Sequence, residues 1–264
     1  MGLQSNGTLW AWGYGGYGRL GNNCTAARSS PVSVVGGFTD WCYISAGRSS
    51  FGIRTNGVLY AWGQNGGRLG DGTAVNRSSP VSVVGGFTDW CAVHNRNPHT
   101  VAVRTNGTAW AWGCNGQGRL GDNSITNRSS PVSVVGGFTD WCQVATAYNA
   151  SIGLRTGGTI YSWGSNGRGL LGINTCGGSC VSPVVISGGV TNWCQIASTY
   201  NSFSALKTDG TIWSWGYNTS GQLGDNTNSS RSSPVSVVGG ITNWCYLGSG
   251  GDGVVPAIRY NLDS

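Results

Sequence analysis

A repeat of about fifty residues runs through this 264-residue chain from end to end. Its first marker is the dipeptide Trp-Gly, whose five copies are separated by 50, 50, 51 and 52 residues. The tryptophans of these dipeptides are Trp12, Trp62, Trp112, Trp163 and Trp215. Self-similarity at such a period is typical of solenoids and propellers, in which one unit buries its apolar face only against its neighbours. We therefore expect residues 1–264 to form a single domain built as one array.

The composition predicts that this array is made of β-strands. Charged residues are 9% of the chain, against roughly 25% in an ordinary globular protein. The sequence has 47 glycines, no glutamate and one lysine, so it lacks the residues that favour exposed helix faces. It offers Val, Ile, Thr, Trp and Tyr between turns of Gly, Asn and Ser. An all-β fold follows.

Each repeat contains four short segments with the character of strands. In one repeat these segments are residues 90–93, 100–104, 108–112 and 131–135. Asn106-Gly107 joins the second and third segments, and Asn-Gly supplies the positive φ angles of a tight hairpin turn. Four strands in every fifty residues describe one blade of a β-propeller.

The residues around this hairpin resemble the regulator of chromosome condensation (RCC1) repeat. The run from Val101 to Asp122 has Asn-Gly before an aromatic-x-Trp-Gly strand, followed by Asn-x-x-Gly-x-Leu-Gly, and the pattern returns from Trp215 to Asp225. The resemblance covers nearly the whole chain. It implies a β-propeller, closest in style to members from bacteriophages and environmental bacteria, and the five Trp-Gly markers predict five four-stranded blades of about 51 residues.

The chain departs from that family in two ways. Members usually carry seven blades, and most have a His-Ser pair before the second strand, which is kept here only as His99-Thr100. The family's best-known activity, nucleotide exchange on a small GTPase coupled to chromatin binding, is therefore an alternative and not the first expectation.

The strand count leaves one strand over. Residues 1–4 and 255–259 both have the character of a second strand, and residues 244–247 have that of a first strand. One interpretation is that the C-terminal strands complete the N-terminal blade and close a five-bladed ring, with one strand displaced. The other is an incomplete ring that another chain completes, which includes a homo-oligomer formed through the terminal strands. We favour closure.

The charge pattern argues against nucleic acid as the partner. The formal net charge is +6, but the basic residues recur once per repeat in fixed places. One set, at the end of the second strand, is Arg54, Arg104, Arg155, Lys207 and Arg259. Such spacing predicts residues that brace turns and carbonyl groups, whereas nucleic-acid binding favours clustered Lys and Arg on one face.

Five of the nine cysteines belong to a second marker, Trp-Cys, and we expect them to be small buried thiols. The exceptions include Cys176 and Cys180, which lie four residues apart in a Gly-rich segment. This separation allows a local disulfide, which would indicate an oxidising location. No local ligand spacing predicts a metal site.

Nothing in the sequence predicts catalysis or a cofactor. His94 and His99 are the only histidines, and no glutamate accompanies them. Asp40, Asp89 and Asp140 recur before Trp-Cys, so we interpret them as turn formers. A residue needed once for chemistry should break the repeat, and these aspartates do not. We expect a protein that is not an enzyme.

The segments after the first strand differ from repeat to repeat, although the strands around them are nearly identical. These segments are residues 45–49, 94–98, 145–149, 197–201 and 248–252. Because they join equivalent strands, we expect them to share one face, where unlike loops on a rigid frame suit binding. The alternative is that exposed loops simply drift. The predicted contact residues are Arg48, Asn95, Arg96, Asn97, His99, Tyr148, Asn149, Tyr200 and Asn201.

These patterns predict a structural or binding propeller. The sequence shows no signal peptide and no apolar run approaching the roughly 18 residues of a membrane span. By resemblance we expect a virion or extracellular component, such as a phage decoration, fibre or adhesion protein, with a capsid, fibre or host-surface protein as partner. The alternatives are a cytoplasmic regulatory module resembling the exchange factors, and an extracellular protein inhibitor.

Overall fold

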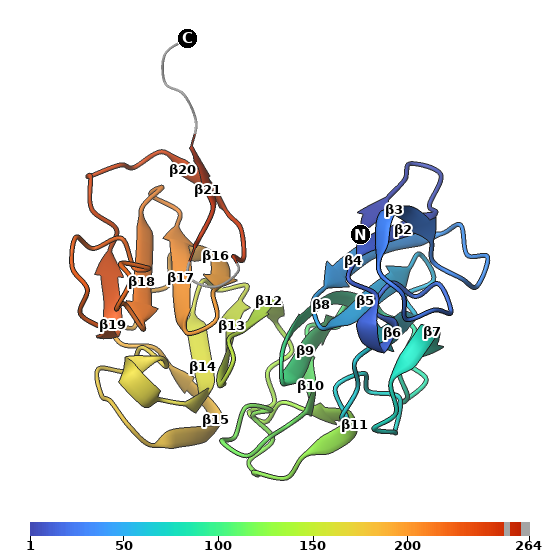
Figure 1. Ribbon diagram of the computed structural model, residues 1–264. Coiled ribbons are helices and arrows are strands. Elements are labelled where there is room, and N and C mark those ends of the chain that lie inside the picture. Colours follow the sequence, from blue (N-terminus) through green and yellow to red (C-terminus); the bar gives the residue numbers. More distant parts are fainter. Residues whose placement is uncertain (251–253, 260–264) are drawn as a thin grey trace. The chain divides into compact units, whose positions relative to one another are not determined.

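The computed structural model describes residues 1–250 and 254–259, which form β-strands, two short 3-10 helices and turns (Figure 1). The 3-10 helices are η1 (Gly16–Gly18) and η2 (Gly167–Gly169). No α-helix occurs among these residues. The predicted all-β class is confirmed. Gly251 and Asp252 of the last predicted loop lie outside the described residues.

Four sheets in the described part of the chain have four strands each, which pair antiparallel in chain order. The first two are β4 (Trp41–Ala46), β5 (Ser49–Arg54), β6 (Leu59–Gly63), β7 (Arg77–Ser82), and β8 (Trp90–Arg96), β9 (His99–Arg104), β10 (Ala109–Gly113), β11 (Arg128–Ser133). The next two are β12 (Trp141–Thr146), β13 (Ala150–Arg155), β14 (Ile160–Ser165), β15 (Ser179–Val185), and β16 (Trp193–Ser198), β17 (Ser202–Lys207), β18 (Ile212–Gly216), β19 (Arg231–Ser236). The predicted four strands per repeat are present, with β8 three residues longer than expected.

The two terminal sheets divide the remaining strands three to two. They are β1 (Gly2–Leu3), β2 (Leu9–Gly13), β3 (Arg28–Ser33), and β20 (Trp244–Leu247), β21 (Ala257–Arg259). β1 pairs with β2 as a second strand pairs with a third, and β21 pairs with β20 as a second strand pairs with a first. Both therefore hold the second-strand place, which is the surplus that the sequence predicts.

The described residues fall into two compact units. Unit 1 consists of residues 1–116 and 126–133 and holds the sheets β1–β3, β4–β7 and β8–β11. Unit 2 consists of residues 117–125 and the chain from 134 onward, and it holds the sheets β12–β15, β16–β19 and β20–β21. Each unit has its own apolar clusters between sheets, around Trp112 in unit 1 and Trp215 in unit 2. The closure of a ring stays a prediction.

The Trp-Gly tryptophans join each four-stranded sheet to the turn of the repeat before it. In unit 1 the indole N–H of Trp112 donates to the carbonyl of Arg68 at 2.8 Å, and the Thr100 hydroxyl donates to the same carbonyl at 3.0 Å. At Gly70, with φ +71°, a Cβ would lie 2.8 Å from the indole nitrogen, so this approach requires glycine. Equivalent bonds join Trp62 and Ser50 to Arg19, and Trp163 and Ser151 to Arg119.

The last of these junctions is built differently. Leu170 replaces the arginine, and Phe203 replaces the Ser or Thr opposite the tryptophan. The indole N–H of Trp215 is buried and has no hydrogen-bond partner among the described residues. Phe203, Leu170 and Trp215 instead share one apolar cluster.

A β-bulge opens each first strand and corrects the expectation of buried thiols. In β4, Trp41 lies opposite Arg54 and Tyr43 opposite Ile53, so Cys42 is the extra residue. Trp41 is buried, whereas Cys42 is exposed and its Sγ donates to the Ile53 carbonyl. The equivalent thiols are also exposed or half-buried: Cys91, Cys142, Cys194 and Cys245. The extra residue of a bulge breaks the inside-outside alternation, so the prediction of buried thiols is wrong.

The aspartates before Trp-Cys form ion pairs, which the turn-former interpretation missed. The Arg54 Nε donates to Asp40 at 2.8 Å, and the guanidinium lies 4.1 Å from the centroid of the Phe38 ring. Two further pairs repeat this arrangement: Asp89 with Arg104 and Asp140 with Arg155. The hydrogen bond from Arg54 holds the pKa of Asp40 below its usual value. In β16–β19, Asn192 and Lys207 take these places, and Lys207 Nζ lies 4.1 Å from the centroid of the Trp213 ring.

The fourth strand is one of the two edge strands of each four-stranded sheet, and it carries a proline. The sequence Arg-Ser-Ser-Pro-Val-Ser forms β3, β7, β11 and β19. Each of these strands pairs with its neighbour through an irregular register near the proline. β15 keeps the proline in a different surrounding sequence.

Candidate protein-binding surface

Two sets of loops lie at the same end of the strands in the sheets β12–β15 and β16–β19 of unit 2. Antiparallel pairing places Gly164 opposite Ala150, and Gly216 opposite Ser202. The residues that follow Trp-Gly are therefore beside the variable segments 145–149 and 197–201. We define the unit 2 loop surface as Tyr148, Asn149, Arg168, Tyr200, Asn201 and Tyr217.

Two tyrosines from neighbouring sheets form the centre of this surface. The Tyr148 and Tyr200 rings are stacked, with centroids 4.7 Å apart and planes 21° apart. The backbone N–H of Tyr148 donates to the Tyr200 carbonyl at 2.9 Å, so the two loops are also joined through the main chain. Tyr200 is 37% exposed and Tyr148 is half-buried. The structure thus brings together the two tyrosines that the sequence predicts as neighbours.

A pocket of about 310 Å³ lies beside this pair. Its polar lining consists of Asn149, Ser165, Arg168, Asn201 and Tyr217. The Arg168 guanidinium lies 4.5 Å from the centroid of the Tyr217 ring. Arg168 also has φ 57°, a left-handed conformation that is uncommon for a residue with a side chain. Amide groups and a guanidinium that face one pocket can donate hydrogen bonds to a carboxylate or a peptide carbonyl.

Tyr217 and Arg168 are absent from the contact residues predicted from sequence. The prediction used only the segments that vary after the first strand. A hairpin rule would have found Tyr217, because the end of the third strand must lie beside the start of the second. The equivalent residue of the first repeat, Tyr17, also has a positive φ. Arg and Tyr rarely adopt this conformation, so the residue type gave no signal for the backbone of Arg168.

In unit 1 the predicted contact residues have mixed positions. Arg48 is exposed, and Arg96 and Asn97 are half-buried. The Asn95 amide is used within the unit, because its Nδ2 donates to the Ser49 carbonyl at 2.8 Å and its Oδ1 accepts from the Ser45 hydroxyl at 2.9 Å. Asn95 therefore joins two sheets, and only its remaining surface is free for a partner.

His99 is wrongly placed among the contact residues. It is the first residue of β9 and is 1% exposed. The equivalent residues Ser49, Ala150 and Ser202 are buried as well, so this is an interior position of the repeat. Desolvation and the charge of Arg96 lower the pKa of His94 to about 4, so its imidazole is uncharged at neutral pH.

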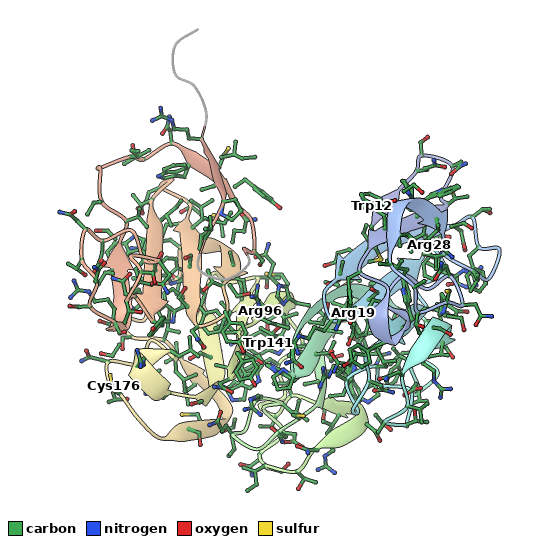
Figure 2. The ribbon with its side chains drawn as sticks, viewed as in Figure 1. Trp12, Arg19, Arg28, Arg96, Trp141 and Cys176 are labelled. Atoms are coloured by element: carbon green, nitrogen blue, oxygen red, sulfur yellow. The ribbon has the colours of Figure 1, made fainter. Side chains whose placement is uncertain are left out.

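The candidate disulfide is not formed in this structure. Cys176 is an exposed free thiol in the loop before β15 (Figure 2), and Cys180 is a half-buried free thiol within that strand. Cys180 lies opposite Gly164 in the sheet, so strand pairing fixes its position. Burial raises the pKa of the Cys180 thiol. A bridge in the isolated protein stays a prediction.

Metal and membrane signals are also lacking in the described part of the chain. Among residues 1–250 and 254–259, no three His, Cys, Asp or Glu side chains gather as metal ligands. No helix in the same ranges combines the length and apolar character needed to cross a bilayer.

Comparison with known families identifies the repeat. A family model described as the regulator of chromosome condensation (RCC1) repeat matches residues 6–51, 106–154 and 209–255, which is more than half of the chain. A second model with the same description matches residues 193–222.

Among characterised proteins, the ultraviolet-B receptor UVR8 of Arabidopsis thaliana is 26% identical over 239 residues, which is 89% of this chain and 54% of the receptor. The chain thus spans about half the length of that relative. Human WBSCR16 has a similar structure, with a TM-score of 0.86, 19% identity, and coverage of 98% of this chain and 69% of that one. Prp20p of Saccharomyces cerevisiae, described with its binding to Gsp1p and histones, has a TM-score of 0.83, 17% identity, and coverage of 99% and 67%.

Proposed function

Because this chain belongs to the regulator of chromosome condensation repeat family, we propose that it is a non-catalytic, regulatory protein-binding module. We place the partner on the unit 2 loop surface. The observation that supports this site is the stacked Tyr148–Tyr200 pair beside a polar pocket. Tyr and Arg are enriched among the residues that dominate binding energy at protein interfaces, and this surface holds both.

The surface is suited to binding because it is already ordered. The hydrogen bond between the Tyr148 and Tyr200 backbones joins the two loops before any partner arrives. The Arg168 guanidinium packs against the Tyr217 ring, and this contact holds the guanidinium in place at the pocket. Side chains that are held in place lose less conformational entropy on binding, so more of the contact energy appears as affinity.

The chemistry of the pocket favours an acidic partner. Arg168, Asn149 and Asn201 offer donors to a carboxylate. The net charge of +6 would add attraction at long range. We therefore propose that an Asp or Glu side chain of the partner enters the pocket while an apolar or aromatic side chain packs on the tyrosine pair.

The relatives support a regulatory role over a particle surface. Prp20p is described with Gsp1p and histones, and yeast RCC1 is described bound to Kap60, so solved structures of this fold include proteins that bind other proteins. None of the similar proteins named here is a virion component. The role as capsid or fibre component, predicted from resemblance, thus has no support from them.

The double substitution Tyr148→Ala/Tyr200→Ala tests the site, with purified Gsp1p and core histones as probes. We expect the parent to bind at least one probe, and the double variant to bind it roughly 30-fold more weakly, since hot-spot truncations cost about 2 kcal/mol or more. Biolayer interferometry measures both affinities, and circular dichroism shows whether the variant is folded. Tyr246→Ala is the matched control, because Tyr246 is an exposed tyrosine of unit 2 outside this surface.

Two results would contradict the proposal in different ways. Binding of the double variant at parental strength would move the site elsewhere. Failure of the parent to bind either probe would remove the exchange-factor-like partner class. A photo-cross-linking residue at position 200, compared with one at 246, would then show whether any acidic protein docks on the surface.

A further inference from the structure

The loop before β15 lacks an ion pair that closes the same loop in other repeats. The residue opposite the Trp-Gly glycine is an arginine in four sheets and Cys180 in the sheet β12–β15. In β7 this arginine, Arg77, donates from Nε to Asp71 at 2.7 Å, and the equivalent pair in β19 has the same length. We call this contact the loop ion pair. Its aspartate follows Leu-Gly, a place that Ile173 takes before β15, so both partners are replaced there.

The aspartate of the loop ion pair also holds a buried asparagine at the centre of the loop. The Asn65 Nδ2 donates to Asp71 at 2.9 Å, and the repeat that contains β19 has the same bond. The equivalent residue before β15 is Asn166, which is buried as well. Its Nδ2 donates to the carbonyl and the hydroxyl of Thr175, at 3.0 and 3.1 Å. This loop is therefore anchored on Asn166 through neutral groups.

Two cysteines flank the glycines that bond to Asn166. The N–H of Gly177 donates to the Asn166 carbonyl at 3.0 Å, and the N–H of Asn166 donates to the Gly178 carbonyl at 3.0 Å. Cys176 precedes the glycines and is exposed (Figure 2), whereas Cys180 is half-buried at the arginine's place in β15. Both glycines have positive φ, 85° and 71°, and a Cβ on either would meet nothing within 4 Å. The backbone between the two thiols thus has the freedom and the room to bring them together.

Asn166 also holds the turn that carries Arg168. The Asn166 carbonyl accepts from the Gly169 N–H at 3.1 Å, and its Oδ1 accepts from the Leu171 N–H at 3.0 Å. These bonds hold η2 against Asn166, and the residues on either side of Asn166 line the pocket together with Arg168. One buried side chain therefore joins the cysteine loop to the unit 2 loop surface.

We propose that Cys176 and Cys180 form a reversible disulfide that takes the place of the loop ion pair and strengthens partner binding at the unit 2 loop surface. This regulation rests on the proposed function of that surface. The disulfide closes the loop around its bonds to Asn166, and Asn166 in turn holds η2 and Arg168 in the conformation that faces the pocket. A closed loop has fewer alternative conformations, so less entropy is lost when a partner binds.

The bridge forms by exchange with a small-molecule disulfide. The Cys176 thiolate attacks one sulfur of that disulfide, and the first small-molecule thiol leaves. The Cys180 thiolate then attacks the Cys176 sulfur of the mixed disulfide, and the second thiol leaves. The protein loses two electrons and two protons, and the small-molecule disulfide is reduced to two thiols. Cys176 reacts first because it is exposed, whereas burial raises the pKa of the Cys180 thiol.

The first test needs no partner, because it measures the two cysteines and their loop. The full chain is equilibrated with mixtures of reduced and oxidised glutathione, free thiols are alkylated, and peptide mass spectrometry locates the bridge. We expect a Cys176–Cys180 bridge that forms and reverses, and a Gly177 amide that exchanges with solvent at least about tenfold more slowly when the bridge is present. Cys142→Ser, at an exposed thiol elsewhere in unit 2, should change neither result.

The second test measures binding after the glutathione is removed, with whichever of Gsp1p and core histones the parent binds. The oxidised parent should bind about fivefold more tightly than the reduced parent, as expected when about one side chain is already ordered. Cys176→Ser should bind like the reduced parent in both conditions. Ile173→Asp/Cys180→Arg restores the loop ion pair and should bind like the oxidised parent in both.

The outcomes separate this regulation from the proposed function. Absence of the bridge at every glutathione ratio would overturn the regulation, and so would equal Gly177 exchange in the two states. Equal or weaker binding by the oxidised parent would overturn it as well. A parent that binds neither probe would contradict the partner class of the proposed function. The yield of the photo-cross-link at position 200 then replaces the affinity, and equal yields in the two states would overturn the regulation.

Discussion

Two junctions in unit 2 bury equivalent Trp-Gly tryptophans, Trp163 and Trp215, through different contacts. Where β12–β15 meets the preceding turn, the Arg119 carbonyl accepts hydrogen bonds from both Trp163 and Ser151. Where β16–β19 meets its preceding turn, Leu170 and Phe203 pack in one apolar cluster with Trp215, and its indole N–H has no hydrogen-bond partner within the described part of the chain. Both tryptophans are fully buried. A buried indole position therefore tolerates either two hydrogen bonds or a larger apolar contact.

The difference shows what the repeat fixes and what it leaves open. Both junctions keep the glycine that lets the indole approach, Gly121 in one and Gly172 in the other. The residue opposite the tryptophan changes from serine to phenylalanine, and the arginine changes to leucine at the same junction. An unpaired buried N–H costs about 1–3 kcal/mol. The added burial of the Phe203 ring is of a size to offset that cost.

The largest expected effect comes from truncating the residue that lies opposite the tryptophan at each junction. Phe203→Ser leaves a cavity in the apolar cluster of unit 2 and should lower the free energy of unfolding by about 3 kcal/mol, as for other buried aromatic truncations. Ser151→Ala loses one hydrogen bond and should cost about 1 kcal/mol. Guanidinium unfolding followed by tryptophan fluorescence measures both. If the two variants lost equal free energy of unfolding, the Phe203 ring and the Ser151 hydroxyl would stabilise their junctions equally. That result would contradict the proposed difference between the junctions.

A smaller difference should separate the two tryptophans themselves. Trp163→Phe removes a hydrogen bond as well as part of the ring, whereas Trp215→Phe removes only part of the ring. We expect Trp163→Phe to be the more destabilising by about 1 kcal/mol, the usual net value of such a bond. The same unfolding experiment compares the two variants. A larger loss for Trp215→Phe would show that its N–H does have a partner in solution, such as a water molecule.

The smallest effect concerns the ion pair that β16–β19 also lacks. The Arg54 hydrogen bond lowers the folded-state pKa of Asp40, so the folded protein binds fewer protons than the unfolded chain as the pH falls. The stabilisation is present above the ordinary carboxyl pKa of about 3.9 and is lost as the pH drops through the lowered value. NMR titration should show the pKa of Asp40 rising toward about 3.9 in Arg54→Gln. Lys207→Gln, in the sheet without the pair, should not move it; an unmoved Asp40 in Arg54→Gln would contradict the assignment.

Most of the fold could be predicted from the period of the sequence. The spacing of Trp-Gly gives the number of repeats, and the strand segments give the sheet order and the surplus second strand. These features depend on backbone pairing within one repeat, and the same strand pattern can be read in every copy of the repeat. The Trp-Cys thiols could not be placed, because the bulge at Cys42 depends on a register that no single strand encodes.

The site was predictable in part. Tyr148 and Tyr200 occupy equivalent places in neighbouring repeats, so their stacking follows from the period. His99 could have been excluded by the buried character expected at its repeat position. Tyr217 needed the hairpin geometry, and the Asp40–Arg54 pair needed a contact across neighbouring strands. Each miss therefore arises where a side chain meets a residue that is near in the sheet and distant in sequence.

The prolines of the outer strands bear on how such a chain avoids misfolding. Four copies of Arg-Ser-Ser-Pro-Val-Ser could exchange places during folding, because any third strand would accept any of them. Proline cannot donate a backbone hydrogen bond, and it is confined to the edges of sheets. An outer strand that contains it is a poor template for one more strand. The fourth-strand edge of each four-stranded sheet is therefore a poor site for a further strand, which opposes the merging of nearly identical neighbours into one continuous sheet while the chain is partly folded.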